Sequence, residues 1–401
     1  MKIELLEIKN IGGISSLLID NFDPKINIIC GKNGIGKTNI LDSIATFFSP
    51  TIGNIYLNVK SGLEKGDIKI LIDKNIYKRE ITKLYTNLTG YSYDDVWIKK
   101  DNEPYQRFES EKQKLIYKKI LYLKTERNFN YQEESSIQAD PSEERREIKN
   151  FKGINKKEIK QWFISRKLHS AHADHLTTIQ KKNFELAKAC FSLLDRDFIF
   201  SKITTKNEII INTPTGEIYF ELLSSGFKST LFILLGIIKE IEYRFQSDNI
   251  LASNFDGVIL IDEIELHLHP EWQGKICSIL TKTFPQAQFI VSTHSPHVIQ
   301  TAEINQVIAL SGKNGHLEKS TVDIAPYGFK GWTIEEILSD VMKMNDLRTK
   351  IYREAKNKFD NALDENNIEA ATEAYKKLDK LLHPQYALRP LFKMQLDSLK
   401  D

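Results

Sequence analysis

The stretch Gly31-Lys32-Asn33-Gly34-Ile35-Gly36-Lys37-Thr38 decides the fold, because it matches the phosphate-loop pattern G-x-x-x-x-G-K-[ST]. It follows the apolar run 26–30 and precedes helical spacing of apolar residues over 40–48. That strand–loop–helix order makes the pattern specific. The glycines let backbone N–H groups surround phosphate oxygens, and the helix N-terminus adds partial positive charge. The sequence therefore predicts a nucleoside triphosphate site.

Within this loop, individual side chains have predictable tasks. Lys37 is expected to reach the β- and γ-phosphates, and the Thr38 hydroxyl is expected to bind Mg²⁺. The alternative is a glycine-rich turn that holds no nucleotide, which the strand–loop–helix order disfavours. The residues predicted to bind ATP from this stretch are Asn33, Gly34, Gly36, Lys37, Thr38 and Asn39.

Composition favours an ordinary globular protein. The chain has 401 residues, 41% of them hydrophobic and 27% charged, and its net charge is only +2, so the overall charge indicates no particular partner. No apolar run approaches the roughly 18 residues that span a bilayer, and the N-terminus lacks a signal-peptide core. We therefore expect a cytoplasmic protein without membrane contact. Cys30, Cys190 and Cys277 show neither disulfide nor zinc spacing.

A second apolar strand, over 257–261, ends in the two carboxylates Asp262 and Glu263. A metal-bound triphosphate needs a carboxylate near Mg²⁺ and a group that deprotonates the attacking water. Neighbouring strand residues point in different directions, so one carboxylate can serve each task. We assign Asp262 to Mg²⁺, through water, and Glu263 to the general base. A surface acidic pair is the alternative, and it is disfavoured beside a phosphate loop.

Strands alternate with helices along most of the chain, which predicts an α/β fold with a mixed, largely parallel sheet. Predicted strands cover 3–9, 16–19, 26–30, 67–73, 76–81, 208–211, 217–220, 257–261, 288–293 and, last, 307–310. Predicted helices cover 40–48, 104–127, 156–195, 231–241, 271–283, 332–341, 347–363 and 368–382, whereas 130–150 is expected to be flexible. The expected regions are an N-terminal ATPase lobe 1–103, a charged helical insertion 104–183, a second lobe 184–325 and a C-terminal helical interaction region 326–401 that contains a helical hairpin.

The order of four motifs resembles the ATP-binding-cassette ATPases, in their SMC/RecF/OLD branch. The motifs are the phosphate loop, Ser224-Ser225-Gly226 before an apolar helix, the strand ending at Asp262-Glu263, and His294 in Ser-Thr-His-Ser-Pro. The resemblance implies an ABC-type ATPase head in which Ser224, Ser225 and Gly226 are a signature that binds the γ-phosphate held by a second protomer. It also implies that His294 contacts the γ-phosphate and the catalytic water, so the expected catalytic set is Lys37, Glu263 and His294.

Several features keep alternatives open. Ser224 could be an ordinary helix N-cap. His267 and His269 lie in the loop that meets the partner in this family, and they could suggest a metal, although a structural role is favoured. The glutamine loop that senses Mg²⁺ in this family has no clear counterpart, with Gln106 or Gln113 as candidates. The tail lacks an acidic triad, so no nuclease site is expected in this chain.

The segment 145–182 is rich in Lys and Arg, with Phe151, Trp162 and Phe163 interleaved. It could bind the backbone of DNA or RNA, but a solvated helix face or a partner surface is the favoured interpretation. The neighbouring His169, His172 and His175 do not have a recognised zinc spacing, which disfavours a metal site. The basic residues considered for nucleic acid are Arg145, Arg146, Lys149, Lys152, Lys156, Lys157, Lys160, Arg166 and Lys167.

The tail around 327–338 resembles that of the PtuA ATPase family of Septu-type and retron-associated anti-phage systems. The resemblance implies a slow ATPase that closes into a homodimer, or a higher even oligomer, on ATP and Mg²⁺ and controls a separate HNH-type nuclease. The alternative is a RecF-like repair or recombination ATPase that binds DNA directly through 145–182. A transporter subunit fits poorly, because the signature reads Ser-Ser-Gly-Phe-Lys.

Overall fold

The computed structural model describes residues 1–49, 59–83, 91–93, 96–100, 103–127, 136–143, 152–172, 174–320, 322, 326–344 and 347–399. The predicted flexible segment 130–150 falls mostly outside these ranges. The chain divides into two compact units, Met1–Lys343 and Met344–Asp401. Across the described residues, no helix is long and apolar enough to cross a membrane.

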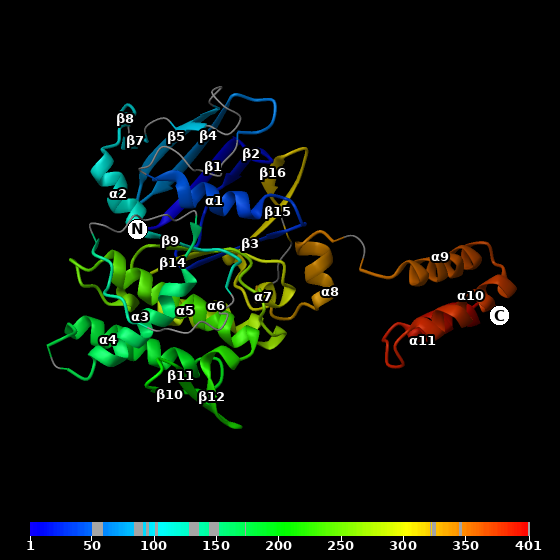
Figure 1. The fold of residues 1–401 in the computed structure, drawn as a ribbon. Coiled ribbons are helices and arrows are strands. Elements are labelled where there is room, and N and C mark those ends of the chain that lie inside the picture. Colours follow the sequence, from blue (N-terminus) through cyan, green and yellow to red (C-terminus); the bar gives the residue numbers. More distant parts are fainter. Residues whose placement is uncertain are drawn as a thin grey trace. The chain divides into compact units, whose positions relative to one another are not determined.

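Among the described residues of the first unit, thirteen strands form one sheet (Figure 1). Its order is β8-β7-β5-β4-β1-β2-β16-β15-β3-β14-β13-β9, with β6 paired to β5. The strands are β1 (Ile3–Ile11), β2 (Ile14–Ile19), β3 (Ile26–Gly31), β4 (Lys65–Ile72), β5 (Asn75–Lys83), β6 (Tyr91–Tyr93), β7 (Trp97–Lys100), β8 (Gln106–Arg107), β9 (Ile120–Leu123), β13 (Val258–Ile261), β14 (Gln288–Ser292), β15 (Val307–Lys313) and β16 (His316–Lys319). The antiparallel half runs from β8 to β2, and the neighbours from β15 to β9 are parallel.

The parallel half is buried on both faces, which explains its nearly continuous apolar strands. On β3, Ile28 and Cys30 pack into one hydrophobic cluster and Ile29 packs into another. The first cluster includes the apolar face of α5, and the second includes that of α1. Figure 1 shows α1 and α5 on opposite sides of this part of the sheet. The mixed α/β fold with a parallel core is the one predicted from the sequence.

The first unit also contains a smaller sheet and a set of helices; the run 156–195, expected to be helical, forms two separate helices and a 3-10 turn, and β10 joins the predicted hairpin of 208–220. A separate three-stranded sheet contains β10 (Ile199–Ile203), β11 (Ile209–Thr213) and β12 (Gly216–Tyr219). The helices are α1 (Lys37–Phe47), α2 (Ser110–Lys118), α3 (Lys156–His169), α4 (Thr178–Ala189), α5 (Ser225–Arg244), α6 (Pro270–Thr283), α7 (Pro296–Gln300) and α8 (Ile334–Glu336). Short 3-10 turns occur at Cys190–Ser192, Phe220–Leu222, Ala252–Asn254 and Ile304–Gln306, and a π-helical turn at Ile337–Val341.

One predicted helix is partly wrong. The run 120–123 was expected to continue a helix over 104–127, but it forms strand β9, which pairs in parallel with β13. All four of its side chains are buried, so a short apolar run here fits a strand enclosed on both faces. The sheet also continues past the predicted last strand, because β16 follows β15 as a hairpin. The predicted boundaries between the two ATPase lobes, the insertion and the C-terminal region, at residues 103, 183 and 325, remain predictions.

The second unit is helical, as expected. It contains α9 (Lys350–Asp364) and α10 (Ile368–Leu381), which form the predicted hairpin, and also α11 (Arg389–Asp397). Phe359, Leu378 and Phe392 bury their side chains in a hydrophobic cluster of this unit, one from each helix. The third helix begins at Arg389 and has Pro390 in its first turn, where proline is tolerated.

Candidate nucleotide-binding site

The candidate site lies where four parallel strands end at the same edge of the sheet. The register places the carboxyl ends of β3, β14, β13 and β9 side by side. The loops that leave these strands carry the phosphate loop, His294, the Asp262-Glu263 pair and Arg127, in that order. Ligands of open α/β sheets bind outside the carboxyl ends of the strands. A cavity of about 580 Å³ at this edge is lined by Asn33, Gly34, Gly36, Lys37, Thr38, Asn39, Glu263 and His294.

The phosphate loop needs its glycines for their backbone conformation and their lack of a side chain. Gly31 has φ 143° and Gly36 has φ 106°, both in the left-handed region that favours glycine. A Cβ atom on Gly31 would lie 2.6 Å from the carbonyl oxygen of Leu310. Gly36 precedes α1 and offers no side chain to cap it. The first N–H groups of α1 are therefore free of a capping side chain at the edge of the cavity, as an anion site requires.

Lys37 begins α1 and curls back over the loop. Its Nζ donates to the carbonyl oxygens of Gly31 (3.0 Å) and Lys32 (3.1 Å). Burial lowers the pKa of this ammonium group, and the carboxylates of Asp262, Glu263 and Glu265 act in the opposite direction. A buried cation held among carbonyl oxygens and carboxylates is suited to neutralise phosphate oxygens.

Thr38, which lines the cavity, contacts Asp262 at the end of β13. The Thr38 hydroxyl donates to Asp262 Oδ1 (3.2 Å) and Oδ2 (3.1 Å), and the Ser292 hydroxyl donates to Asp262 Oδ1 (2.6 Å). Hydroxyl and carboxylate oxygens are the ligands that Mg²⁺ prefers. The donor set therefore fits the metal predicted for this pair, and Ser292 holds the carboxylate in place.

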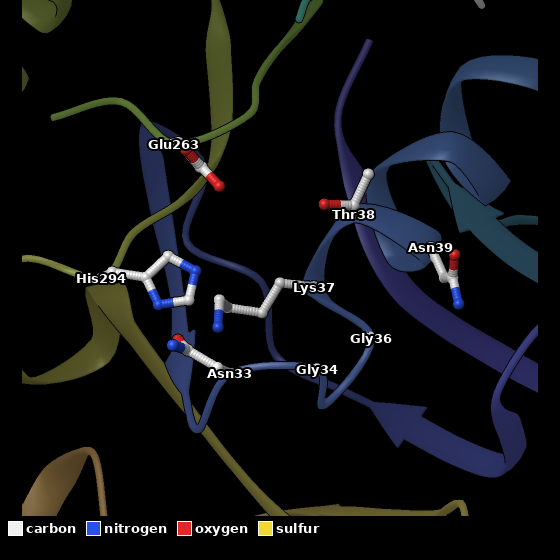
Figure 2. A pocket seen from close by; sticks show the side chains of 8 residues that line it. All are labelled: Asn33, Gly34, Gly36, Lys37, Thr38, Asn39, Glu263 and His294. Carbon is white, nitrogen blue, oxygen red and sulfur yellow. The ribbon is translucent and has the colours of Figure 1, made fainter. Parts of the chain in front are cut away.

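Glu263 and His294 face Lys37 across the cavity. Figure 2 shows the side chains of Lys37, Glu263 and His294 pointing into the same space, whereas Asn39 points away from it. The Glu263 backbone has φ 48°, an uncommon conformation for a residue with a side chain. Its N–H donates to Ser292 Oγ (2.7 Å). The predicted general base is thus set on a tightly turned backbone at the end of β13.

Glu265 and Arg127, which had no role assigned from the sequence, fix the backbone of this site. Glu265 accepts from Thr293 Oγ1 (2.7 Å) and from the N–H of His294 (2.6 Å), so it links the loop after β13 to the histidine. Arg127 donates to the carbonyl oxygens of Asp262 and Glu263. In the sequence, Arg127 is marked only by its position shortly after the apolar run 120–123. That position becomes informative only when the run is interpreted as a strand.

The predicted signature does not line this cavity. Ser224 caps α5, and its Oγ accepts from the N–H of Phe227 (3.4 Å). The start of α5 packs closely on the loop after β13, because a Cβ atom on Gly226 would lie 2.8 Å from the carbonyl oxygen of His267. The Ser229 hydroxyl also donates to the Leu266 carbonyl oxygen (3.0 Å). The start of α5 and the loop after Glu263 are therefore joined.

The histidine and glutamine candidates take other roles. Gln113 is buried and donates to the Phe108 carbonyl oxygen (2.7 Å), and neither it nor Gln106 lines the cavity. His269 caps α6 by accepting from the N–H of Glu271 (3.4 Å). Within the described ranges, no group of three or more His, Cys, Asp or Glu side chains is arranged to hold a metal ion.

The basic segment is less available to nucleic acid than its sequence suggested, which is a correction. Lys160 is buried between Glu208 and Glu221, and Arg166 is buried between Asp140 and Glu242. Both interleaved rings on α3, Trp162 and Phe163, lie in the hydrophobic core. These side chains face inward because α3 packs against α5 and carries part of the core. Arg145, Arg146, Lys149 and Phe151 lie outside the described residues.

Comparison with known proteins identifies relatives along the whole chain. Residues 26–300 match the AAA_21 family, described as "AAA domain, putative AbiEii toxin, Type IV TA system". The chain is 41% identical over 405 residues to the "Septu protein PtuA" of Bacillus thuringiensis, covering 98% of this chain and 97% of that protein. It is 36% identical over 140 residues to the "Retron Ec83 probable ATPase" of Escherichia coli, covering 34% of this chain and 24% of that protein.

Among solved structures, the "SMC head domain from Thermotoga maritima" aligns with a TM-score of 0.47 and 17% identity. The alignment covers 81% of this chain and 100% of that one.

Proposed function

The chain belongs to the AAA_21 family and to the PtuA family of Septu proteins, and from this membership we propose that it is a cytoplasmic ATPase of anti-phage defence that controls a separate nuclease. The observation that carries the proposal is the convergence of Lys37, Glu263 and His294 on one cavity beside the Thr38–Asp262 pair. These groups supply phosphate binding, a metal-binding pair of oxygen ligands and a base, which are the parts that phosphoryl transfer to water requires.

In the proposed reaction, the β- and γ-phosphates of ATP lie against the loop N–H groups and Lys37. Thr38 and Asp262 would hold Mg²⁺, which neutralises charge on the phosphates when it is bound. Glu263 takes a proton from the attacking water, the bond from the γ-phosphorus to the bridging oxygen breaks, and ADP and phosphate form. His294 orients the water and the γ-phosphate, and Glu265 fixes its backbone through the N–H of His294.

We further propose that the active state is a head-to-tail dimer, or a higher even oligomer, with Ser224, Ser225 and Gly226 completing the site of the partner. The support is that this segment starts α5, away from the cavity of its own chain, and is joined to the loop that carries Glu263. Closure around ATP would then move the signature and the loop after Glu263 together. Because the site is complete only after assembly, turnover should be slow.

The proposed partner is an HNH-type nuclease bound by the C-terminal helical region 326–401. Supporting this, the unit 344–401 has its own hydrophobic cluster and also leaves Ile351, Leu391 and Met394 exposed, with Met394 at 68%. A helical unit that buries one apolar face and leaves other apolar side chains in solvent is suited to bind a protein. We expect a variant truncated after Lys343 to keep ATP binding and to lose the nuclease in a pull-down.

The decisive experiment for the ATPase uses Glu263→Gln in the full chain. Loss of a general base should lower hydrolysis by about 10²–10⁴-fold while ATP stays bound. Lys37→Ala should lose ATP binding itself, and Lys206→Ala, an exposed lysine in the turn after β10, is the matched control. Phage plating with the neighbouring nuclease gene present should lose protection with Lys37→Ala and keep it with Lys206→Ala. Full hydrolysis by Glu263→Gln would refute the assignment of the base.

A further inference from the structure

Arg127 is a fully buried cation directly behind the two carboxylates of the site. It follows β9 by four residues and is 0% exposed. Its Nε donates to the Lys124 carbonyl oxygen (3.0 Å), its Nη1 to the Glu263 carbonyl oxygen (3.2 Å), and its Nη2 to the Asp262 carbonyl oxygen. One planar side chain thus joins the end of β9 to both residues at the end of β13.

The charge of Arg127 is costly to bury, so its position needs a reason. Burial lowers the pKa of the guanidinium to about 10, while Asp262, Glu265 and Glu263 favour its charged form. The side chain therefore remains a cation at neutral pH. Removing a charged group from water without close compensation is strongly unfavourable, and the nearby carboxylates provide that compensation.

The backbone of Glu263 needs support from both sides. Its φ of 48° is unfavourable for a residue with a Cβ atom and persists only where the surroundings enforce it. The Glu263 N–H is held by Ser292 Oγ (2.7 Å), and its carbonyl oxygen is held by Arg127 (3.2 Å). The same serine also donates to Asp262 Oδ1 (2.6 Å). Arg127 and Ser292 together fix the turn that aims the Glu263 side chain into the cavity.

We propose that Arg127 is a positioning residue for ATP hydrolysis, which holds the Asp262–Glu263 backbone so that Glu263 faces the cavity. The proposal rests on the proposed ATPase function. Arg127 itself lies behind the carbonyl groups and does not line the cavity, so it acts through Glu263. The guanidinium fixes this geometry by donating to two carbonyl oxygens, those of Asp262 and Glu263.

Two substitutions test how Arg127 holds the Asp262–Glu263 backbone. Arg127→Lys keeps a positive charge and loses the forked geometry, whereas Arg127→Met loses both. Because an error of about 1 Å in a catalytic group costs about 100-fold, we expect kcat to fall about 100-fold in each, with KM for ATP within about threefold.

Arg79→Lys is the matched control. Arg79 is also buried and donates to backbone carbonyls, those of Thr46 (3.3 Å) and Ser49 (3.1 Å) among them, at the far end of α1. It should lower the melting temperature as the Arg127 variants do, while kcat stays unchanged. A wild-type kcat in Arg127→Lys and Arg127→Met would overturn the proposal, as would an equal loss of kcat in Arg79→Lys.

Hydrogen exchange gives a readout that does not depend on hydrolysis. Amides over 262–266 should exchange faster in Arg127→Lys than in the wild type, and they should be unchanged in Arg79→Lys. Unchanged exchange in Arg127→Lys would overturn the positioning role even if the wild type hydrolyses no ATP. If the wild type had no ATPase activity, but amides over 262–266 still exchanged faster in Arg127→Lys alone, the proposed function would be refuted. The positioning of the loop by Arg127 would remain supported.

Discussion

The Thr38 hydroxyl lies 3.1 Å from Asp262 Oδ2, although the two residues are 224 positions apart in the chain. They meet because β3 and β13 flank β14 in parallel, so the phosphate loop and the acidic pair leave the same edge of the sheet. The contact joins the first and second halves of the ATPase site. It also places a hydroxyl and a carboxylate where one metal ion could bind both.

The first prediction concerns this pair. Thr38→Ala should raise the Mg²⁺ concentration needed for half-maximal ATPase activity by about tenfold or more, because one oxygen ligand is lost. Thr38→Ser keeps the hydroxyl and should resemble the wild type. Titration of Mg²⁺ at saturating ATP measures the shift. The same Mg²⁺ dependence in Thr38→Ala and Thr38→Ser would rule out this hydroxyl as a ligand.

The second prediction concerns the buried Arg166–Glu242 pair that joins α3 to α5. The side chains are 2% and 5% exposed, and Trp162 Nε1 also donates to Glu242 Oε1 (3.1 Å). Arg166→Met leaves a buried carboxylate without its cation and should reduce the free energy of unfolding by about 3–5 kcal/mol. The double variant Arg166→Met with Glu242→Gln should recover much of this loss. Urea unfolding at pH 8 provides the measurement.

The decrease in the free energy of unfolding caused by Arg166→Met should depend on pH. Burial already raises the pKa of Glu242, and Arg166 opposes that rise. Without Arg166 the folded pKa is higher still, so the folded state binds a proton that the unfolded state releases, and stability falls as pH increases. The deficit should therefore be smaller at pH 5 than at pH 8. Lys275→Met, which breaks an exposed pair with Glu271, should cost less than about 1 kcal/mol at both values.

The third prediction concerns two buried thiols. Burial raises the pKa of both Cys30 and Cys190 to about 12. At pH 8 only about one thiol in ten thousand is ionised at such a pKa, so neither should react with iodoacetamide in the folded chain. Mass spectrometry after alkylation in buffer and in urea measures this, with the urea sample as the control. Modification of Cys30 in buffer, next to the phosphate loop, would show that β3 is accessible to solvent.

Much of the site was predictable because its motifs are local. The phosphate loop and the Asp262-Glu263 pair each combine a short pattern with an adjoining apolar strand, so the sequence alone indicated both elements and side chains. The residues of these motifs that line the cavity are Asn33, Gly34, Gly36, Lys37, Thr38, Asn39 and Glu263, together with His294, and their roles in nucleotide binding stay predictions. Helical periodicity likewise predicted the hairpin of α9 and α10.

What was missed depends on contacts between distant segments. Lys160 and Arg166 were read as part of a basic surface, since their partners Glu208 and Glu242 lie 48 and 76 positions away. Strand β9 was read as helix because four apolar residues fit either element, and only its pairing with β13 decides between them. Arg127 had no assigned role because its contacts with Asp262 and Glu263 depend on where β9 ends.

A composite ATP site, completed by the signature of a second protomer, can be distinguished from a self-contained one by subunit mixing. Lys37→Ala and Ser225→Arg should each be inactive alone. Lys37→Ala cannot bind the phosphates, and Ser225→Arg cannot supply a usable signature to its partner. Co-expressed, the mixed dimer retains one intact site, formed by Lys37 of one protomer and Ser225 of the other. ATPase activity should then recover to about one quarter of the wild-type value, because half of randomly formed dimers are mixed and each mixed dimer has one intact site of two. Activity that stays at the level of the single variants in purified mixed dimers would contradict it.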